Sequence, residues 1–157
     1  MPHLVRPTVI LVTVVASVLA VAVYALAAAQ AENTLEIVVG NGPHAGTYKP
    51  PAESIICMHY KKEKRYFATW KDFDAHDAKT IAEAGINVLN PDDAGPKHGE
   101  VRIAFGDPAK KPTVYSVNPG PLTMTMTRKG AEIMFRGKTK DGIDLRVTAK
   151  CSDVDQF

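Results

Sequence analysis

Apolar and polar residues alternate with a period of two along much of the chain after residue 31. The alternation is clearest at 122–127, where Leu122, Met124 and Met126 share one face and three threonines the other, and again at 143–149. Shorter β-branched or alternating runs lie at 35–39, 46–48, 54–60, 66–70, 86–89, 101–105, 113–117 and 132–139. Since successive side chains of a strand point to opposite faces, each run predicts a strand with one buried face.

Two stretches interrupt this pattern. Residues 74–84 fit either a short helix, capped by Asp74 or Asp77 and ended by Gly85, or an extended segment. Residues 90–100 contain two prolines, two glycines and two adjacent aspartates, which is typical of a surface loop. We therefore expect an all-β domain with at most one short helix, built as an antiparallel β-sandwich or a small barrel.

The amino terminus has a different pattern. Residues 8–29 carry no charge, Arg6 precedes them, and small side chains at Ala29 and Ala31 stand immediately before Glu32. This arrangement predicts a signal peptide cleaved after Ala31. A retained membrane anchor is the alternative, because a helix of this length would span about 33 Å. Either reading divides the chain into a leader at 1–31 and one domain at 32–157, outside the cytoplasmic membrane.

Composition narrows the class of protein. The chain has 157 residues and 45% of them are apolar, which excludes a disordered or collagen-like chain. Without residues 1–31, which hold one arginine and no acid, 18 basic and 17 acidic side chains remain of the 19 and 17 in the whole chain. A nucleic-acid partner is not expected from such a balance.

The predicted export also bears on whether the two cysteines are oxidised. Cys57 and Cys151 lack the close spacing of a metal or redox motif. An even pair in an oxidising compartment usually forms a disulfide, so we expect these two residues to be joined.

Several short motifs resemble a family of small bacterial cell-envelope lipoprotein antigens. They are Gly46-Thr47 before the strand that holds Cys57, the segment 99–103, Phe135-Arg136-Gly137, and the strand 145–148 followed by Cys151. The resemblance implies a disulfide-tied β-sandwich displayed outside the cytoplasmic membrane. The family is lipidated on a cysteine at the end of its signal, and residues 1–31 contain no cysteine. The resemblance therefore implies neither a lipid anchor nor a catalytic residue.

Candidate metal chemistry is confined to one acidic segment. Asp72, Asp74, His76 and Asp77 could gather oxygen ligands for calcium, but they lack the EF-hand pattern, and a solvated loop with capping aspartates is the alternative. The histidines show no zinc-ligand spacing, and the serines stand in no nucleophile motif. We expect no cofactor and no catalytic residue.

A basic run forms the other candidate site. Lys61, Lys62, Lys64 and Arg65 stand next to aromatic residues that include Tyr66 and Trp70. Cations and aromatic rings at a hairpin tip could bind anionic lipid headgroups, envelope polymers or an acidic protein, although a turn kept soluble by charge would look the same.

These observations predict an exported, non-enzymatic binding module, secreted or periplasmic, whose partner is an envelope component or another protein. Two alternatives are open. One is a small extracytoplasmic hydrolase with a site built from loops around His76 or His98. The other is a structural envelope protein anchored by residues 8–29.

Overall fold

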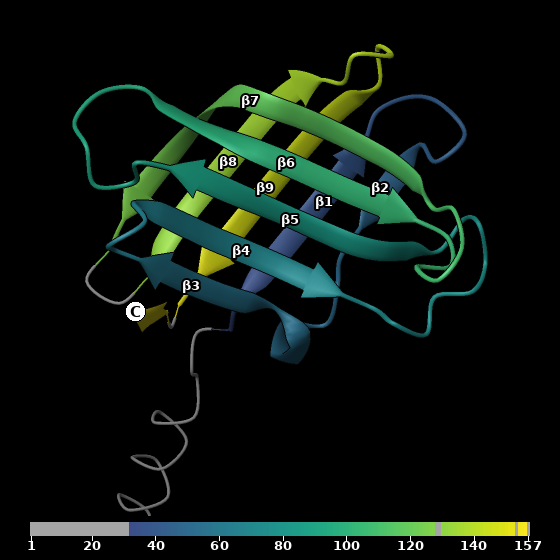
Figure 1. Ribbon diagram of the computed structural model, residues 1–157, viewed down its shortest axis with the longest axis horizontal. Helices are drawn as coiled ribbons and strands as arrows, with labels where there is room; N and C mark the ends of the chain where they lie inside the picture. Colours follow the sequence, from purple (N-terminus) through teal and green to yellow (C-terminus); the bar gives the residue numbers. More distant parts are fainter. Residues whose placement is uncertain (1–31, 128–129, 153, 157) are drawn as a thin grey trace, which may run out of the picture. The chain divides into compact units, whose positions relative to one another are not determined.

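The alternating residues form ten strands of one sheet within the part of the chain that the structure, a computed structural model, describes: residues 32–127, 130–152 and 154–156 (Figure 1). The strands are β1 (Thr34–Val39), β2 (Gly46–Tyr48), β3 (Ile56–Tyr60), β4 (Arg65–Lys71), β5 (Ile81–Leu89), β6 (Lys97–Phe105), β7 (Thr113–Met126), β8 (Ala131–Lys138), β9 (Asp144–Cys151) and β10 (Asp155–Gln156). Their order in the sheet is β10-β3-β4-β5-β6-β7-β8-β9-β1-β2. All neighbours are antiparallel except β10 and β3.

The predicted leader at 1–31, with Ala29 and Ala31, lies outside the described residues, and residues 32–157 form a separate compact unit. None of the described residues belongs to a helix long and apolar enough to cross a bilayer.

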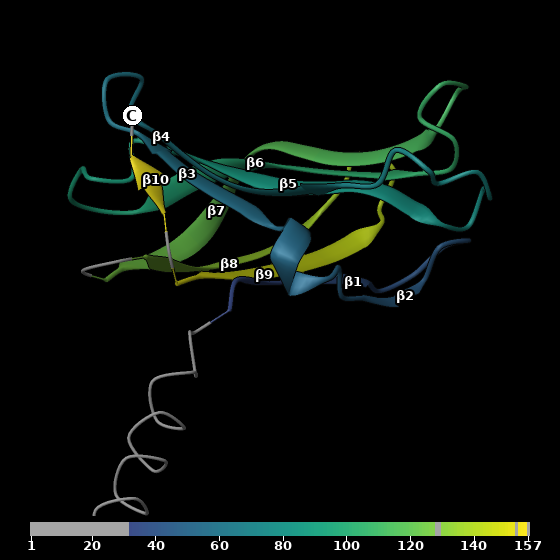
Figure 2. The same cartoon turned by 90° about the horizontal axis from the view of Figure 1, so that it is seen from below.

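The sheet curls into two layers because β7 belongs to both of them (Figure 2). Its first part pairs with β6, and residues 122–126 pair with β8. Strands β3 to β6 therefore form one layer with the start of β7, and β8, β9, β1 and β2 form the other with its end. This arrangement confirms the all-β prediction. The helix alternative for 74–84 is wrong: residues 81–84 begin β5, and Ala52–Ser54, a single 3-10 turn, is the helical element of the described chain.

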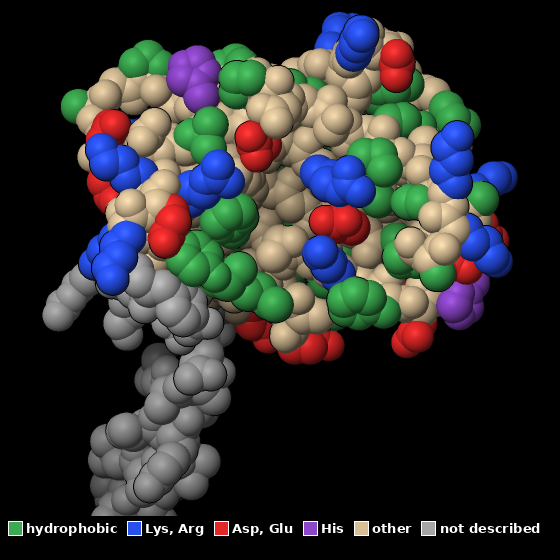
Figure 3. All heavy atoms as spheres, in the orientation of Figure 1, with side chains coloured by type: hydrophobic (Ala, Val, Ile, Leu, Met, Phe, Trp, Pro, Cys, Tyr) green, Lys and Arg blue, Asp and Glu red, His purple; other side chains and the backbone are tan. Residues whose placement is uncertain are grey.

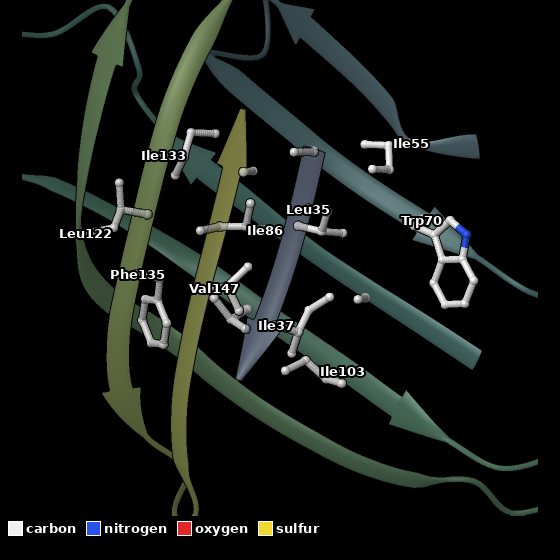
Figure 4. Packing of buried hydrophobic residues seen from close by; sticks show 14 of the residues in the cluster. Leu35, Ile37, Ile55, Trp70, Ile86, Ile103, Leu122, Ile133, Phe135 and Val147 are labelled. Atoms are coloured by element: carbon white, nitrogen blue, oxygen red, sulfur yellow. The ribbon is translucent and has the colours of Figure 1, made fainter. Parts of the chain in front are cut away.

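The inward side chains of both layers make one hydrophobic core (Figure 4). Fully buried members include Ile37, Ile86, Ile103, Ile133 and Val147, each at 0–1% exposure. These residues recur at every second position of their strands, so the period-two pattern in the sequence is the pattern of burial. Burial of this apolar face of each layer is the main force that holds the sheet curled.

The two sides of the open sheet are tied together by a covalent bond. Cys57 of β3 and Cys151 of β9 form a disulfide with their Cα atoms 6.1 Å apart, which confirms the predicted pairing. Asn33 joins the same two regions: its Nδ2 donates to the carbonyl oxygen of Ile55 at 3.2 Å, and its Oδ1 accepts from the backbone N–H of Ser152 at 2.9 Å. The sandwich is thus closed here by a cystine, an asparagine and the short parallel pairing of β10, which follows β9 in the chain, with β3.

One end of the core is closed by a buried histidine. His44 stacks on Phe105 with ring centroids 4.3 Å apart. Its Nε2 lies 3.0 Å from the carbonyl oxygen of Ala78, which can only accept, so Nε2 donates. Its Nδ1 lies 2.8 Å from the Tyr115 hydroxyl. His44 therefore fixes the loop after β1 against the loop before β5, which is a structural role.

Candidate functional site

The basic run forms the tight turn between β3 and β4. Lys64 has a φ of 53°, and its carbonyl oxygen accepts a hydrogen bond from the backbone N–H of Asn90 at 2.8 Å, which fixes the turn against the loop after β5. The Lys64 ammonium lies 3.9 Å from Asp93, whereas Lys61, Lys62 and Arg65 are exposed and make no ion pair with any described residue. The structure therefore gathers all four predicted cations at one tip.

The aromatic residues of this hairpin divide between the two faces of the sheet. Tyr66 is 0% exposed and Trp70 7%, and both belong to the hydrophobic core. Their predicted place in a binding surface is therefore wrong. Tyr60 and Phe67, on the opposite parity, are the half-buried aromatic residues of the outer face. The disulfide supplies the signal that sets the parity: Cys57 must point inward, so Met58 and Tyr60 point outward.

The outward side chains surround a shallow pocket of ≈ 440 Å³, lined by Met58, Tyr60, Glu63, Arg65 and Phe67. The Tyr60 and Phe67 rings meet edge to face with centroids 5.7 Å apart, and the Tyr60 hydroxyl donates to the Met58 sulfur at 3.4 Å. Ile56, with 52% of its surface exposed, continues the apolar row along β3.

We call this surface the hairpin face. It comprises the apolar side chains of Ile56, Met58, Tyr60 and Phe67 and the cations Lys61, Lys62, Lys64 and Arg65. Figure 3 shows hydrophobic side chains gathered over β3 and β4, with basic side chains beside them at the hairpin end. An apolar patch bordered by positive charge can bind a surface that is both apolar and anionic.

Tyr66 belongs to the hydrophobic core and not to the hairpin face. Its buried hydroxyl has no hydrogen-bond partner among the described residues. Burial raises the pKa of this phenol well above its ordinary value of 10.0. The Tyr66 phenol therefore ionises at a lower pH in the unfolded chain than in the folded protein. As a result, the free energy of unfolding falls as the pH rises above about 10.

We expect Tyr66→Phe to leave the stability at pH 7 unchanged or to raise it by about 1 kcal/mol, because the variant removes a buried polar group that has no partner. The variant should also lose less stability than the wild type between pH 9 and pH 11, a range about one unit either side of the ordinary tyrosine pKa. Urea unfolding at several pH values measures both effects. An alkaline loss equal to that of the wild type would contradict this account of Tyr66.

The acidic segment does not gather its side chains. Asp72 Oδ1 accepts the backbone N–H of Asp74 at 2.9 Å, and Asp77 Oδ1 accepts that of Lys79 at 2.7 Å. His76 is exposed and lies 3.9 Å from Asp107. Across the described residues, no three His, Cys, Asp or Glu side chains are placed to hold a metal ion together. The aspartates act here as turn-forming residues, the alternative that the sequence left open.

Asp107 is the partner that the sequence did not indicate for His76. The backbone N–H of Ala109 and the Lys110 ammonium hold the pKa of the Asp107 carboxyl below its usual value. This carboxylate follows the end of β6, whereas His98 is the second residue of the same strand. A strand of nine residues separates its ends by roughly 25 Å. His76 and His98 therefore cannot contribute to one loop-built active site.

The chain matches no protein-family profile, no curated protein and no solved structure.

Proposed function

We propose that the chain is an exported, non-enzymatic binding module of the cell envelope or the secreted fraction, and that the hairpin face is its contact surface. The disulfide between Cys57 and Cys151 indicates an oxidising, extracytoplasmic environment. Within that environment, the uncharged apolar segment 8–29 favours a secreted or periplasmic location. The lipoprotein-antigen resemblance is a further reason to expect display at the envelope.

The observation that carries the proposal is the combination of apolar and cationic side chains on the hairpin face. Tyr, Met and Arg are enriched in interfaces, and Tyr60, Met58 and Arg65 all line its pocket. A turn that needed charge only for solubility would not require an apolar row beside it. A partner that covers both groups would remove apolar surface from water and neutralise the cations.

Site-specific photocrosslinking in the producing cells tests the proposal. A photoreactive phenylalanine analogue at position 60 should give a discrete adduct, which disappears when Lys61, Lys62 and Lys64 are changed to glutamate. The matched control places the same analogue at position 73, because Phe73 is 78% exposed but lies outside the hairpin face. Absence of any adduct from position 60, or equal labelling from both positions, would overturn the proposal.

A further inference from the structure

We infer that the hairpin face docks on a lipid bilayer surface that contains anionic lipid, an inference that rests on the proposed function and names its partner. Three properties of the surface lead to this partner: where the apolar row lies, how the charges beside it are paired, and how shallow the contact region is.

The apolar row lies near the margin of its layer. Ile56, Met58 and Tyr60 occupy alternate positions of β3, so their outward side chains extend over about 13 Å, and Phe67 is the direct cross-strand partner of Met58. Beyond β3 the sheet has one further strand, β10, whose described residues pair with Met58 and His59 of β3. Figures 1 and 2 show β3 at the margin and its turn rising above the layer. A flat surface can therefore reach the row and the turn together.

Most of the cations at the hairpin tip are not paired within the described residues: Lys64 lies 3.9 Å from Asp93, whereas Lys61, Lys62 and Arg65 have no ion pair there. Residues 61–65 hold four cations and one acid, Glu63, and the Asp93 carboxylate lowers their net charge of +3 to +2. Farther along the outer face the pairing is different: Lys71 and Arg102 lie 3.6 and 3.4 Å from Glu83. The outer face thus keeps its excess positive charge at the tip, next to the apolar row. A polybasic segment of this kind is attracted to anionic lipid headgroups.

The shape and the side chains suit a bilayer better than a folded partner. The contact region is shallow, and its apolar members are an isoleucine, a methionine and two aromatic rings. Tyr60 has an apolar ring and a polar hydroxyl, the combination found at the level of lipid headgroups. Long lysine side chains can follow headgroups that move laterally while their aliphatic stems remain near apolar surface.

Vesicle binding by the domain 32–157 tests the inference, since this unit contains the hydrophobic core and both cysteines. The domain is produced in an oxidising compartment and its folding is verified by thermal melting. It should bind vesicles of mixed phosphatidylcholine and phosphatidylglycerol, and bind pure phosphatidylcholine far more weakly. Lys61→Glu, Lys62→Glu and Lys64→Glu together should weaken binding to the anionic vesicles on the order of 100-fold.

Two matched controls separate local effects from general ones. Lys79, Lys111 and Lys140 are exposed lysines without an ion pair to any described residue, and their combined change to glutamate alters the net charge equally but should leave most of the binding. Ile56→Ser should weaken binding roughly tenfold, because it removes apolar surface that enters the headgroup region. Val114→Ser changes a residue of 38% exposure on β7 and should have little effect.

The outcomes distinguish the inference from the proposed function. Equal vesicle binding by the wild type and the tip triple variant would overturn the bilayer inference. If position 60 then crosslinks to a protein or polymer in cells, the proposed function stands with a different partner. Concentration-dependent dimers that disappear with Ile56→Ser, without vesicle binding, would assign the surface to a second copy and also overturn the inference. Failure of both vesicle binding and crosslinking would overturn both.

Discussion

Removing the disulfide should cause one of the two largest losses of stability in this protein. The Cys57→Ala, Cys151→Ala variant is expected to unfold with a free energy lower by about 4 to 5 kcal/mol in the chain-entropy description of a loop of this length. The two cysteines are separated by 94 positions, so the bond restricts most of the unfolded domain. Both are almost fully buried, and alanine keeps their positions apolar.

Urea unfolding of the oxidised wild type, the reduced wild type and the double variant measures this effect. Reduction should destabilise the wild type by nearly the same amount as the double substitution, and reductant should not affect the variant. The loss concerns the side of the sandwich where the described strand pairing is limited to two residues of β10 against β3, so amide exchange in β3 and at the end of β9 should increase most. A loss below about 1 kcal/mol would show that Asn33 and the core hold this side closed without the bond.

The strands could be predicted well wherever burial on one face produced an alternating sequence. The segment 81–84 could not be assigned, because Ala82, Glu83 and Ala84 are also good helix formers. In the structure Ala82 and Ala84 point into the core and Glu83 lies between two cations on the outer face. Tertiary packing against the opposite layer, which the local sequence does not encode, decides the extended form.

The extent of β7 was not predicted for a different reason. The sequence pattern separated the runs 113–117 and 122–127, with Pro119 and Pro121 between them, but residues 113–126 form one strand. The pairing with β6 shifts between Val101, opposite Val117, and Gly99, opposite Gly120. Asn118 and Pro119 thus oppose the single residue Glu100, and a proline in such a bulge removes no ladder hydrogen bond. The bulge lies where the strand passes from one layer to the other.

The sequence predicted the cations of the candidate site but only some of its aromatic residues. Cations in a turn are exposed whatever the register, so Lys61, Lys62 and Lys64 could be assigned from their position alone. Tyr66 and Phe67 are neighbours in the sequence, and a shift of one residue exchanges the buried one and the outward one. Only the pairing of β3 with β4 and the inward position of Cys57 fix that choice.

A second large effect is expected at the corner where β7 changes layer. Phe135 is fully buried, and its ring fills the space that two glycines leave open. A Cβ atom on Gly120 would lie 2.6 Å from Phe135 Cε2, and one on Gly137 would lie 2.7 Å from Phe135 Cζ. Phe135→Ala should therefore lower the free energy of unfolding by about 3 to 5 kcal/mol, because the rigid backbone around the ring can collapse only partly into the cavity.

A double-mutant cycle with Gly120→Ala shows whether the ring and the glycine fit each other as the structure indicates. Gly120 has no positive φ, so alanine is not strained by the backbone itself. Its cost of about 1 to 3 kcal/mol should come mainly from contact with the ring, since Val117 Cγ1, the other near atom, would lie farther away at 3.0 Å. In the Phe135→Ala background that contact is gone, and the added methyl group should fill part of the cavity. The two losses should then sum to more than the loss of the double variant by about 0.5 to 3 kcal/mol, measured by urea unfolding. Additive losses would mean that the two sites act independently and that the corner does not depend on this contact.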